Sequence, residues 1–165
     1  MSGAVRLRAS RPGDLAYVTA LERHPDNGEH IGQWSDEEHL AAMAGKNRRS
    51  HWIIERRGMP AGYLITYDVR AQDAGFYVKR ILVDVKERGT GKAALGEFIE
   101  KAFEVERAEL VWLIVRDGNA RAQAVYRALG FERFDPEGEE LARYEAIDDA
   151  PAAATFRMIL RNPAV

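Results

Sequence analysis

The predicted fold of these 165 residues is α/β (α+β), with one mixed, mostly antiparallel sheet flanked by helices. A hairpin pattern lies over residues 51–67, and a continuous apolar run over residues 110–115 is typical of a central strand buried on both faces. Segments of helical periodicity separate the other strand patterns. With 46% hydrophobic residues the chain is sized for one core, so we expect a single domain over residues 1–165.

The first third of the chain predicts a strand followed by two helices. Residues 5–9 alternate apolar and polar side chains, as a half-buried strand does. Apolar residues then repeat at helical spacing up to the turn formers at 24–28, namely Leu15, Val18 and Leu21. Residues 35–38 (Ser-Asp-Glu-Glu) resemble a capping box and open a second helix, with Leu40 and Met43 on its predicted apolar face.

The remainder of the chain predicts six strands and two longer helices. The strands lie at residues 51–55 and 62–67, which form the hairpin, and at 76–83, 110–115, 131–134 and 155–160. One helix follows Gly91, and another runs from Asn119 to Leu129 and ends at Gly130. The acidic, alanine-rich connection over residues 137–149 predicts a solvated loop or a short helix.

Composition excludes several classes of protein and site. The net charge of -2 does not indicate a broad nucleic-acid footprint, so we expect no nucleic-acid partner. The absence of cysteine excludes disulfides, thiolate nucleophiles and Cys-ligated zinc. No apolar run approaches the ~20 residues of a membrane span, and residues 1–6 do not resemble a signal peptide. A cytoplasmic protein without a membrane partner is the expectation.

The sequence Arg88-Gly89-Thr90-Gly91-Lys92-Ala93 predicts an anion site. It follows a strand pattern and opens a helix, whose first backbone N–H groups and positive dipole end suit a phosphate. The glycines allow close backbone approach, and Arg88 and Lys92 add positive charge. On these six residues alone, a plain strand-to-helix turn explains the pattern equally well. A Walker A motif is excluded because Ala93 follows Lys92, and the three-glycine spacing of a dinucleotide fingerprint is absent.

A second segment, residues 119–131, has the form Asn…Ala…Tyr…Leu-Gly-Phe. Together with the glycine loop and the order of elements, it makes the chain resemble the GNAT superfamily of acyl-CoA-dependent N-acetyltransferases. The resemblance covers nearly the whole chain, with residues 1–75 supported by element order alone. The resemblance implies acetyl-CoA as cosubstrate, no metal, and a V-shaped splay between the fourth and fifth strands.

The resemblance also implies roles for individual residues. Ile81, Leu82 and Val83 would pair with the pantetheine arm of acetyl-CoA, and the loop from Arg88 through Gly89, Thr90, Gly91 and Lys92 to Ala93 would hold its pyrophosphate. Asn119 would contact the cofactor arm, although an N-cap explains it as well. Tyr126 would protonate the departing thiolate, although its place on an apolar stripe also fits a core aromatic.

The general base is not predicted. An amine with a pKa near ~10.4 must lose a proton before it attacks, and related enzymes use a glutamate on the strand before the loop or on the buried strand. Residues 77–80 and 113–115 contain no carboxylate. Substitutes in principle are Asp84, Asp117, Glu29, His30 or a water chain.

Other polar and aromatic residues favour ordinary roles. His24, His30, His39 and His51 lack metal-ligand spacing and are predicted to be surface or loop residues. The predicted function is transfer of an acetyl group to a primary amine of a small molecule or peptide by direct attack. The alternative is a non-catalytic acyl-CoA-binding sensor or partner-binding module. The segments 24–34 and 137–149 are expected to border the acceptor pocket, and pairing of the C-terminal strands of two copies would make a homodimer.

Overall fold

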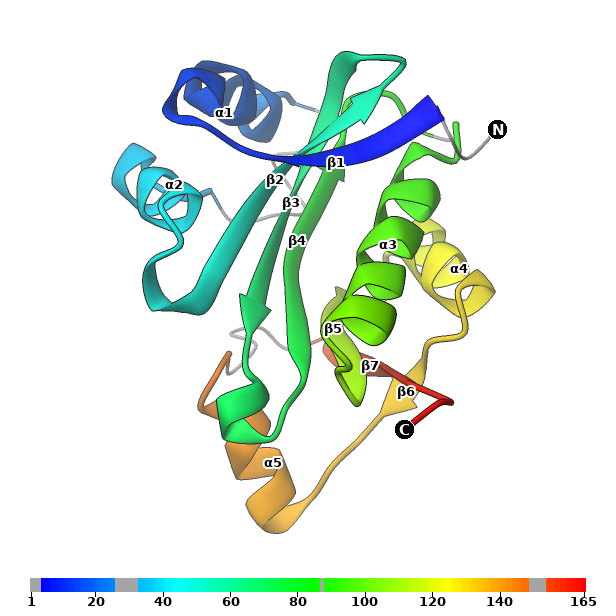
Figure 1. The fold of residues 1–165 in the computed structure, drawn as a ribbon. Coiled ribbons are helices and arrows are strands. Elements are labelled where there is room, and N and C mark those ends of the chain that lie inside the picture. The colour runs from blue at the N-terminus through cyan, green and yellow to red at the C-terminus, as the bar shows by residue number, and fades with distance from the viewer. Residues whose placement is uncertain (1–3, 26–32, 87, 149–153) are drawn as a thin grey trace. The chain divides into compact units, whose positions relative to one another are not determined.

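The computed structural model describes residues 4–25, 33–86, 88–148 and 154–165, and its seven strands form one sheet in the order β1-β2-β3-β4-β5-β7-β6 (Figure 1). Contacts divide the described chain into two compact units, residues 1–67 with 79–98 and residues 68–78 with 99–165. Strand β4 (Phe76–Val83) contributes to both units. The mixed sheet confirms the predicted fold class, and the single domain over residues 1–165 stays a prediction.

The first unit contains the N-terminal strands. Strands β1 (Val5–Ala9) and β2 (Arg49–Arg56) pair antiparallel, and β2 pairs antiparallel with β3 (Met59–Asp68) to form the predicted hairpin. A register shift at Ile54 and Glu55 marks an irregularity near the end of β2. Beyond β3 lies the second half of β4, and just after its end the Asp84 N–H donates to the Ala61 carbonyl over 2.9 Å.

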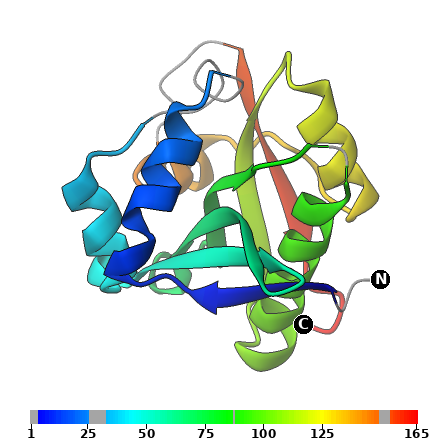
Figure 2. The same ribbon diagram turned by 90° about the horizontal axis from the view of Figure 1, so that it is seen from above.

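Helices cover both faces of this part of the sheet (Figure 2). Helices α1 (Leu15–Arg23) and α2 (Asp36–Met43) lie on one face, and α3 (Thr90–Glu100) lies on the opposite face. Val18 of α1 packs with Tyr63 and Leu82 on the first face. Ala94 of α3 packs with Ile54 on the second. Short 3-10 turns occupy Pro12–Asp14, Lys46–Arg48 and Arg70–Gln72, and a π-helical turn, Lys101–Val105, continues α3.

The second unit is built on β5 (Leu110–Arg116). The start of β4 pairs parallel with β5 at Phe76, Tyr77 and Val78, and β7 (Thr155–Arg161) pairs antiparallel with both β5 and β6 (Glu132–Phe134). Helix α4 (Ala120–Ala128) and helix α5 (Gly138–Glu145) complete this unit. The predicted splay beyond Val78 stays a prediction.

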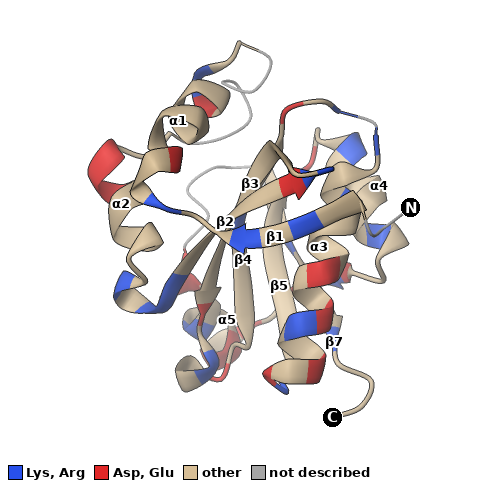
Figure 3. Ribbon diagram, turned by 45° about the horizontal axis from the view of Figure 1, so that its top comes forward, with Lys and Arg blue, Asp and Glu red and all other residues tan. Residues whose placement is uncertain are grey.

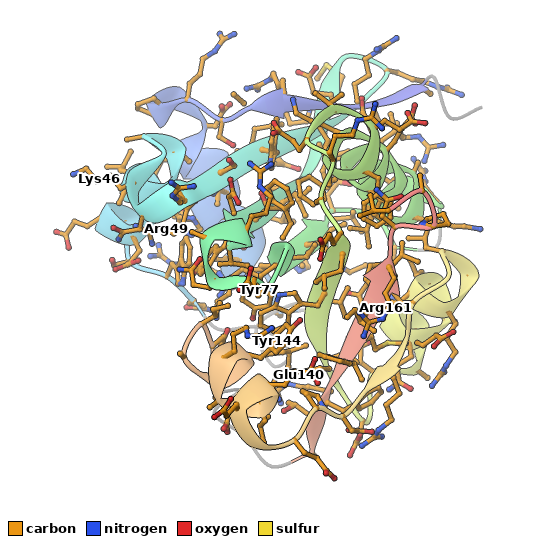
Figure 4. The ribbon with its side chains drawn as sticks, turned by 60° about the horizontal axis from the view of Figure 1, so that its bottom comes forward. Lys46, Arg49, Tyr77, Glu140, Tyr144 and Arg161 are labelled. Carbon is orange, nitrogen blue, oxygen red and sulfur yellow. The ribbon has the colours of Figure 1, made fainter. Side chains whose placement is uncertain are left out.

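Aromatic side chains form the core of the second unit. The buried Trp112 ring stacks on Tyr77 at 4.2 Å and meets Tyr144 edge-on at 4.8 Å, and its indole N–H donates to the Ala74 carbonyl over 2.9 Å. Tyr77 and Tyr144 are labelled in Figure 4. Helix α5 therefore confirms a short helix in the acidic connection, where Tyr144 anchors it to the core.

The prediction of which residues form the apolar face of α2 is wrong in part. Ser35 caps the helix as expected, because its hydroxyl accepts from the Glu38 N–H over 3.2 Å. Leu40 is 37% exposed, however, and the buried residues of α2 are His39 and Ala42. The cause is a buried polar network around His39, which places the face of α2 that contains His39 and Ala42 against the core.

Charged side chains of both signs are spread over the elements. Figure 3 shows basic residues on β1 and acidic residues at the start of α2, where the carboxylates of residues 36–38 lie at the positive end of the helix. None of the helices in the described part of the chain is long and apolar enough to cross a membrane.

Candidate functional site

The predicted phosphate loop lies in the first unit, between the end of β4 and the start of α3. Gly89 has a φ of +75°, in the left-handed region that favours glycine, and its carbonyl accepts the first helical hydrogen bond, from the Ala93 N–H at 3.0 Å. A Cβ at Gly89 would meet no atom within 4 Å, so the surface over this turn is open. Arg88 and Lys92 are exposed on either side. The first N–H groups of the helix, which have no acceptor within the helix itself, and two cations therefore come together in one turn.

The strand before the loop presents its residues alternately to the two faces. Leu82 lies in the core beside Tyr63, whereas Ile81 and Val83 pack toward α3. The Val83 carbonyl accepts from the Lys86 ammonium over 2.7 Å. This carbonyl has one partner, and its second lone pair leaves room for another donor. The predicted pairing of residues 81–83 with a pantetheine arm stays a prediction.

At Gly62, the backbone of β3 lies very close to the backbone of β4. A Cβ at residue 62 would lie 2.2 Å from the Leu82 carbonyl oxygen and 2.9 Å from the Val83 Cα. No side chain fits at that separation, so glycine lets β3 approach the residues predicted to bind the donor. No motif marks this role in the sequence; an isolated glycine inside a strand pattern is the one signal of such a close backbone approach.

Arg56, at the end of β2, also contacts the loop and was missed. Its Nη1 donates to the Arg88 carbonyl over 3.2 Å and to the Thr90 Oγ1 over 2.9 Å. The Thr90 side chain is buried, and its residue is 3% exposed. No motif marks Arg56 in the sequence, because its contacts join residues more than thirty positions apart.

Tyr126 and Asn119 both lie in the second unit, on α4 and at its N-cap. The Asn119 Oδ1 accepts from the Ala122 N–H over 3.1 Å, which confirms the N-cap. Tyr126 packs against Phe131 at a ring distance of 5.9 Å. Its surface is half-buried, but the surrounding protein desolvates the phenol and raises the pKa of Tyr126 to about 12. The phenol therefore keeps its proton at neutral pH, as a proton donor must.

The base candidates do not converge on one group. Asp84 and Asp117 are both exposed, and Glu29 and His30 lie outside the described residues. Among the buried residues of the described chain, Glu22 of α1 is the one carboxylate, and it is 1% exposed. No sequence signal pointed to it.

Glu22 is the centre of a buried polar network in the first unit. Its Oε2 accepts from the Tyr63 hydroxyl over 2.6 Å and from the Arg80 Nη1 over 2.9 Å. The His39 Nε2 lies 2.7 Å from the same oxygen, at ion-pair distance but without the alignment of a hydrogen bond. Burial acts to raise the pKa of Glu22, but the contacts with His39, Tyr63 and Arg80 outweigh it and hold the pKa below its usual value. Glu22 is therefore a stable carboxylate and a poor proton acceptor.

Two histidines continue the network toward β1. The His39 Nδ1 lies 3.1 Å from the His51 Nε2, and the His51 Nδ1 lies 2.7 Å from the Ser10 Oγ. Burial, and then the electrostatic effect of the neighbouring His39 ring, lower the pKa of His51 to about 3, so the His51 ring is neutral at physiological pH. The prediction that these histidines are surface or loop residues is wrong, because His39 is 0% and His51 is 3% exposed. Within the described ranges, no group of three potential metal ligands comes together.

The family model of the acetyltransferase (GNAT) family matches residues 15–131. The chain therefore belongs to this family, which confirms the predicted membership. It is 31% identical over 108 residues to the [ribosomal protein bS18]-alanine N-acetyltransferase of Escherichia coli K12, a match that covers 66% of this chain and 70% of that protein.

Solved structures share the fold. AAC(6')-Ib in complex with paromomycin and acetyl-CoA aligns with a TM-score of 0.79 and 18% identity over 98% of this chain and 95% of that one. The spermidine N-acetyltransferase of Vibrio cholerae in complex with CoA and spermine aligns with a TM-score of 0.74 and 14% identity, over 97% and 96% of the two chains. At these identities the likeness extends to the fold alone.

Proposed function

We propose that the protein transfers the acetyl group of acetyl-CoA to a primary amine. The observation that supports this most is the loop between β4 and α3, where an open glycine turn at a helix start lies between two exposed cations in a chain of the acetyltransferase (GNAT) family. These features suit a pyrophosphate, because helix N-terminal amides and side-chain cations both stabilise its negative charge.

The donor would lie along the first unit. Ile81, Leu82 and Val83 would offer backbone groups to the pantetheine arm, and the turn from Arg88 to Ala93 would hold the pyrophosphate. Asn119 would contact the cofactor arm while it caps α4. The fit is supported by the open surface over Gly89 and by the exposure of Arg88 and Lys92.

The chemistry would be direct attack in a ternary complex. The neutral amine adds to the thioester carbonyl, the C–N bond forms, and the C–S bond breaks as the tetrahedral intermediate collapses. A backbone N–H near Val83 would stabilise the oxyanion. The nitrogen gives up one proton to solvent, and Tyr126 donates its phenolic proton to the sulfur and regains a proton from solvent, so the enzyme ends the cycle unchanged.

The acceptor that we propose to test first is the α-amino group of a protein N-terminus. The bacterial relative is named for an alanine of a ribosomal protein. An α-amine has a pKa of about 8, so roughly a fifth of it is neutral at physiological pH, whereas an amine with a pKa of about 10.4 is almost wholly protonated and needs a base. The exposed Asp84 and Asp117 and the stably ionised Glu22 do not supply such a base. Polyamines and aminoglycosides are the competing acceptors.

Thiol release from acetyl-CoA tests this function. We expect release with short peptides that have a free N-terminal amine, and none with the same peptides blocked by N-terminal acetylation. The alternative, a non-catalytic acyl-CoA-binding module, would show tight acetyl-CoA binding by calorimetry without thiol release across peptides, spermine and aminoglycosides. Absence of both binding and release would overturn the proposal.

A further inference from the structure

Arg56 is the last residue of β2, and its side chain crosses to the loop between β4 and α3. The hydrophobic contacts of the first unit explain this placement. Ile54 of β2 packs with Ala94 of α3 and with Val83 of β4, which brings the end of β2 beside the start of the helix. The half-buried Arg56 then reaches the loop with a single nitrogen, Nη1.

The two bonds of Arg56 act on different parts of the turn. The bond to the Arg88 carbonyl, at 3.2 Å, holds a backbone acceptor that would otherwise be free to turn toward a bound phosphate and repel it. The bond to the Thr90 hydroxyl, at 2.9 Å, ties down the first residue of α3, whose N–H is one of those with no partner inside the helix. Both bonds favour a turn that presents donors to an anion.

The cation of Arg56 is held in place more firmly than those of Arg88 and Lys92. Arg88 and Lys92 are exposed and lose side-chain freedom when they bind an anion, whereas Arg56 is already held by two hydrogen bonds. A cation that is already positioned contributes to binding at a smaller cost in entropy.

We infer that Arg56 is a positioning residue for the donor site. It orders the Arg88–Thr90 backbone for the pyrophosphate of acetyl-CoA and adds a fixed positive charge beside it. This inference rests on the proposed function, and it assigns to β2 a part in donor binding that the loop motif does not contain.

The first test measures the affinity for acetyl-CoA by calorimetry in Arg56→Ala, Arg56→Gln and Arg56→Lys. Loss of a charge-assisted interaction predicts about tenfold weaker binding for Arg56→Ala. Arg56→Gln, which keeps donors without charge, should fall between Arg56→Ala and wild type, and Arg56→Lys should lie closest to wild type. Arg23→Ala is the matched control, because this exposed arginine ends α1 on the opposite face of the sheet.

Two further readouts separate positioning from a merely structural role. Removal of a cation that acts on the pyrophosphate should reduce the salt dependence of acetyl-CoA binding, and it should raise the KM for acetyl-CoA with little change in kcat at saturation. In a double-mutant cycle with Thr90→Val, the double variant should lose less binding free energy than the two single variants lose in sum, because Arg56 and Thr90 share one contact.

The outcomes are distinct. If wild type binds acetyl-CoA and the Arg56 variants bind it equally well with the same salt dependence, the inference is overturned and the proposed function stands. If wild type does not bind acetyl-CoA, the proposed function itself fails. If Arg56→Ala does not fold, Arg56→Gln and Arg56→Lys still decide the question by their affinity and salt dependence.

Discussion

Tyr126 keeps its proton far above neutral pH, because burial raises its pKa to about 12. The phenol is therefore still protonated when the C–S bond breaks and can donate to the departing thiolate, although the raised pKa makes it a weaker acid than an ordinary tyrosine. The same burial leaves Tyr126 packed against Phe131, so the residue also has a structural role.

We predict that Tyr126→Phe lowers kcat by about 10²-fold, the lower end of the range for a lost general acid, and leaves acetyl-CoA affinity nearly intact. Phenylalanine keeps the packing and removes the hydroxyl alone. Thiol-release assays measure the first effect and calorimetry the second. An unchanged kcat would contradict the proton-donor role.

Single buried residues of the first unit were the hardest to predict. Glu22, His39 and His51 have no motif, and their spacing in the sequence is unremarkable for any site. They meet only because α1, α2 and β2 pack on one another, and the network then satisfies groups that would be costly to bury alone. Hydrophobic periodicity alone predicts that polar residues of this kind lie on the surface.

At the scale of elements, β3 and β4 depend on a close backbone approach at Gly62. We predict that Gly62→Ala destabilises the protein by roughly 2 kcal/mol or more, in the range of overpacked sites, because its Cβ would lie 2.2 Å from the Leu82 carbonyl oxygen. Acetyl-CoA affinity should fall as well, since the displaced strand contains the predicted donor contacts.

Urea unfolding measures the change in stability. Gly13→Ala is the matched control, because a Cβ there would meet nothing within 4 Å. Equal unfolding midpoints for the two variants would contradict the proposed role of Gly62.

Helix α4 depends on its cap at Asn119. Asn119→Ala should cost roughly 0.5–2 kcal/mol of stability, whereas Asn119→Ser keeps a side-chain oxygen that accepts from the helix and should cost much less. If Asn119 also contacts the cofactor arm, acetyl-CoA binding should weaken in both variants. Thermal unfolding and calorimetry together separate the two roles. Unchanged acetyl-CoA affinity in Asn119→Ser would mean that the side chain caps the helix and does not contact the cofactor arm.

At the scale of the whole molecule, the buried network makes stability depend on pH. The folded pKa of His51 is about 3 and its ordinary value is 6.5, so between these values the unfolded chain binds a proton that the folded chain does not. The pKa of Glu22 is also lowered from 4.5, which adds stability that is lost as the pH falls through its folded value. Both groups therefore reduce the free energy of unfolding as the solution becomes acidic.

We predict that the urea midpoint of wild type falls between pH 6.5 and pH 4, and that His51→Gln loses part of this dependence. The variant should also be less stable at pH 8, because it loses the ordered contacts to Ser10 and His39. A non-titrating, exposed side chain supplies the control: Val105 is 70% exposed, and Val105→Ala should keep the full slope. An identical slope in His51→Gln would contradict the assignment of a neutral, buried ring.

Local patterns alone determined the order of the elements, the glycine turn before α3 and the cap of α4, because periodicity, turn chemistry and helix capping act over a few neighbouring residues. The motifs at 88–93 and 119–131 were enough to predict the family. Three features were decided by the tertiary structure alone. The backbone of β4 approaches Gly62 closely, Arg56 donates a hydrogen bond to Thr90 in the loop, and His39 instead of Leu40 lies on the buried face of α2. These features depend on contacts between residues far apart in the chain, which no local pattern contains.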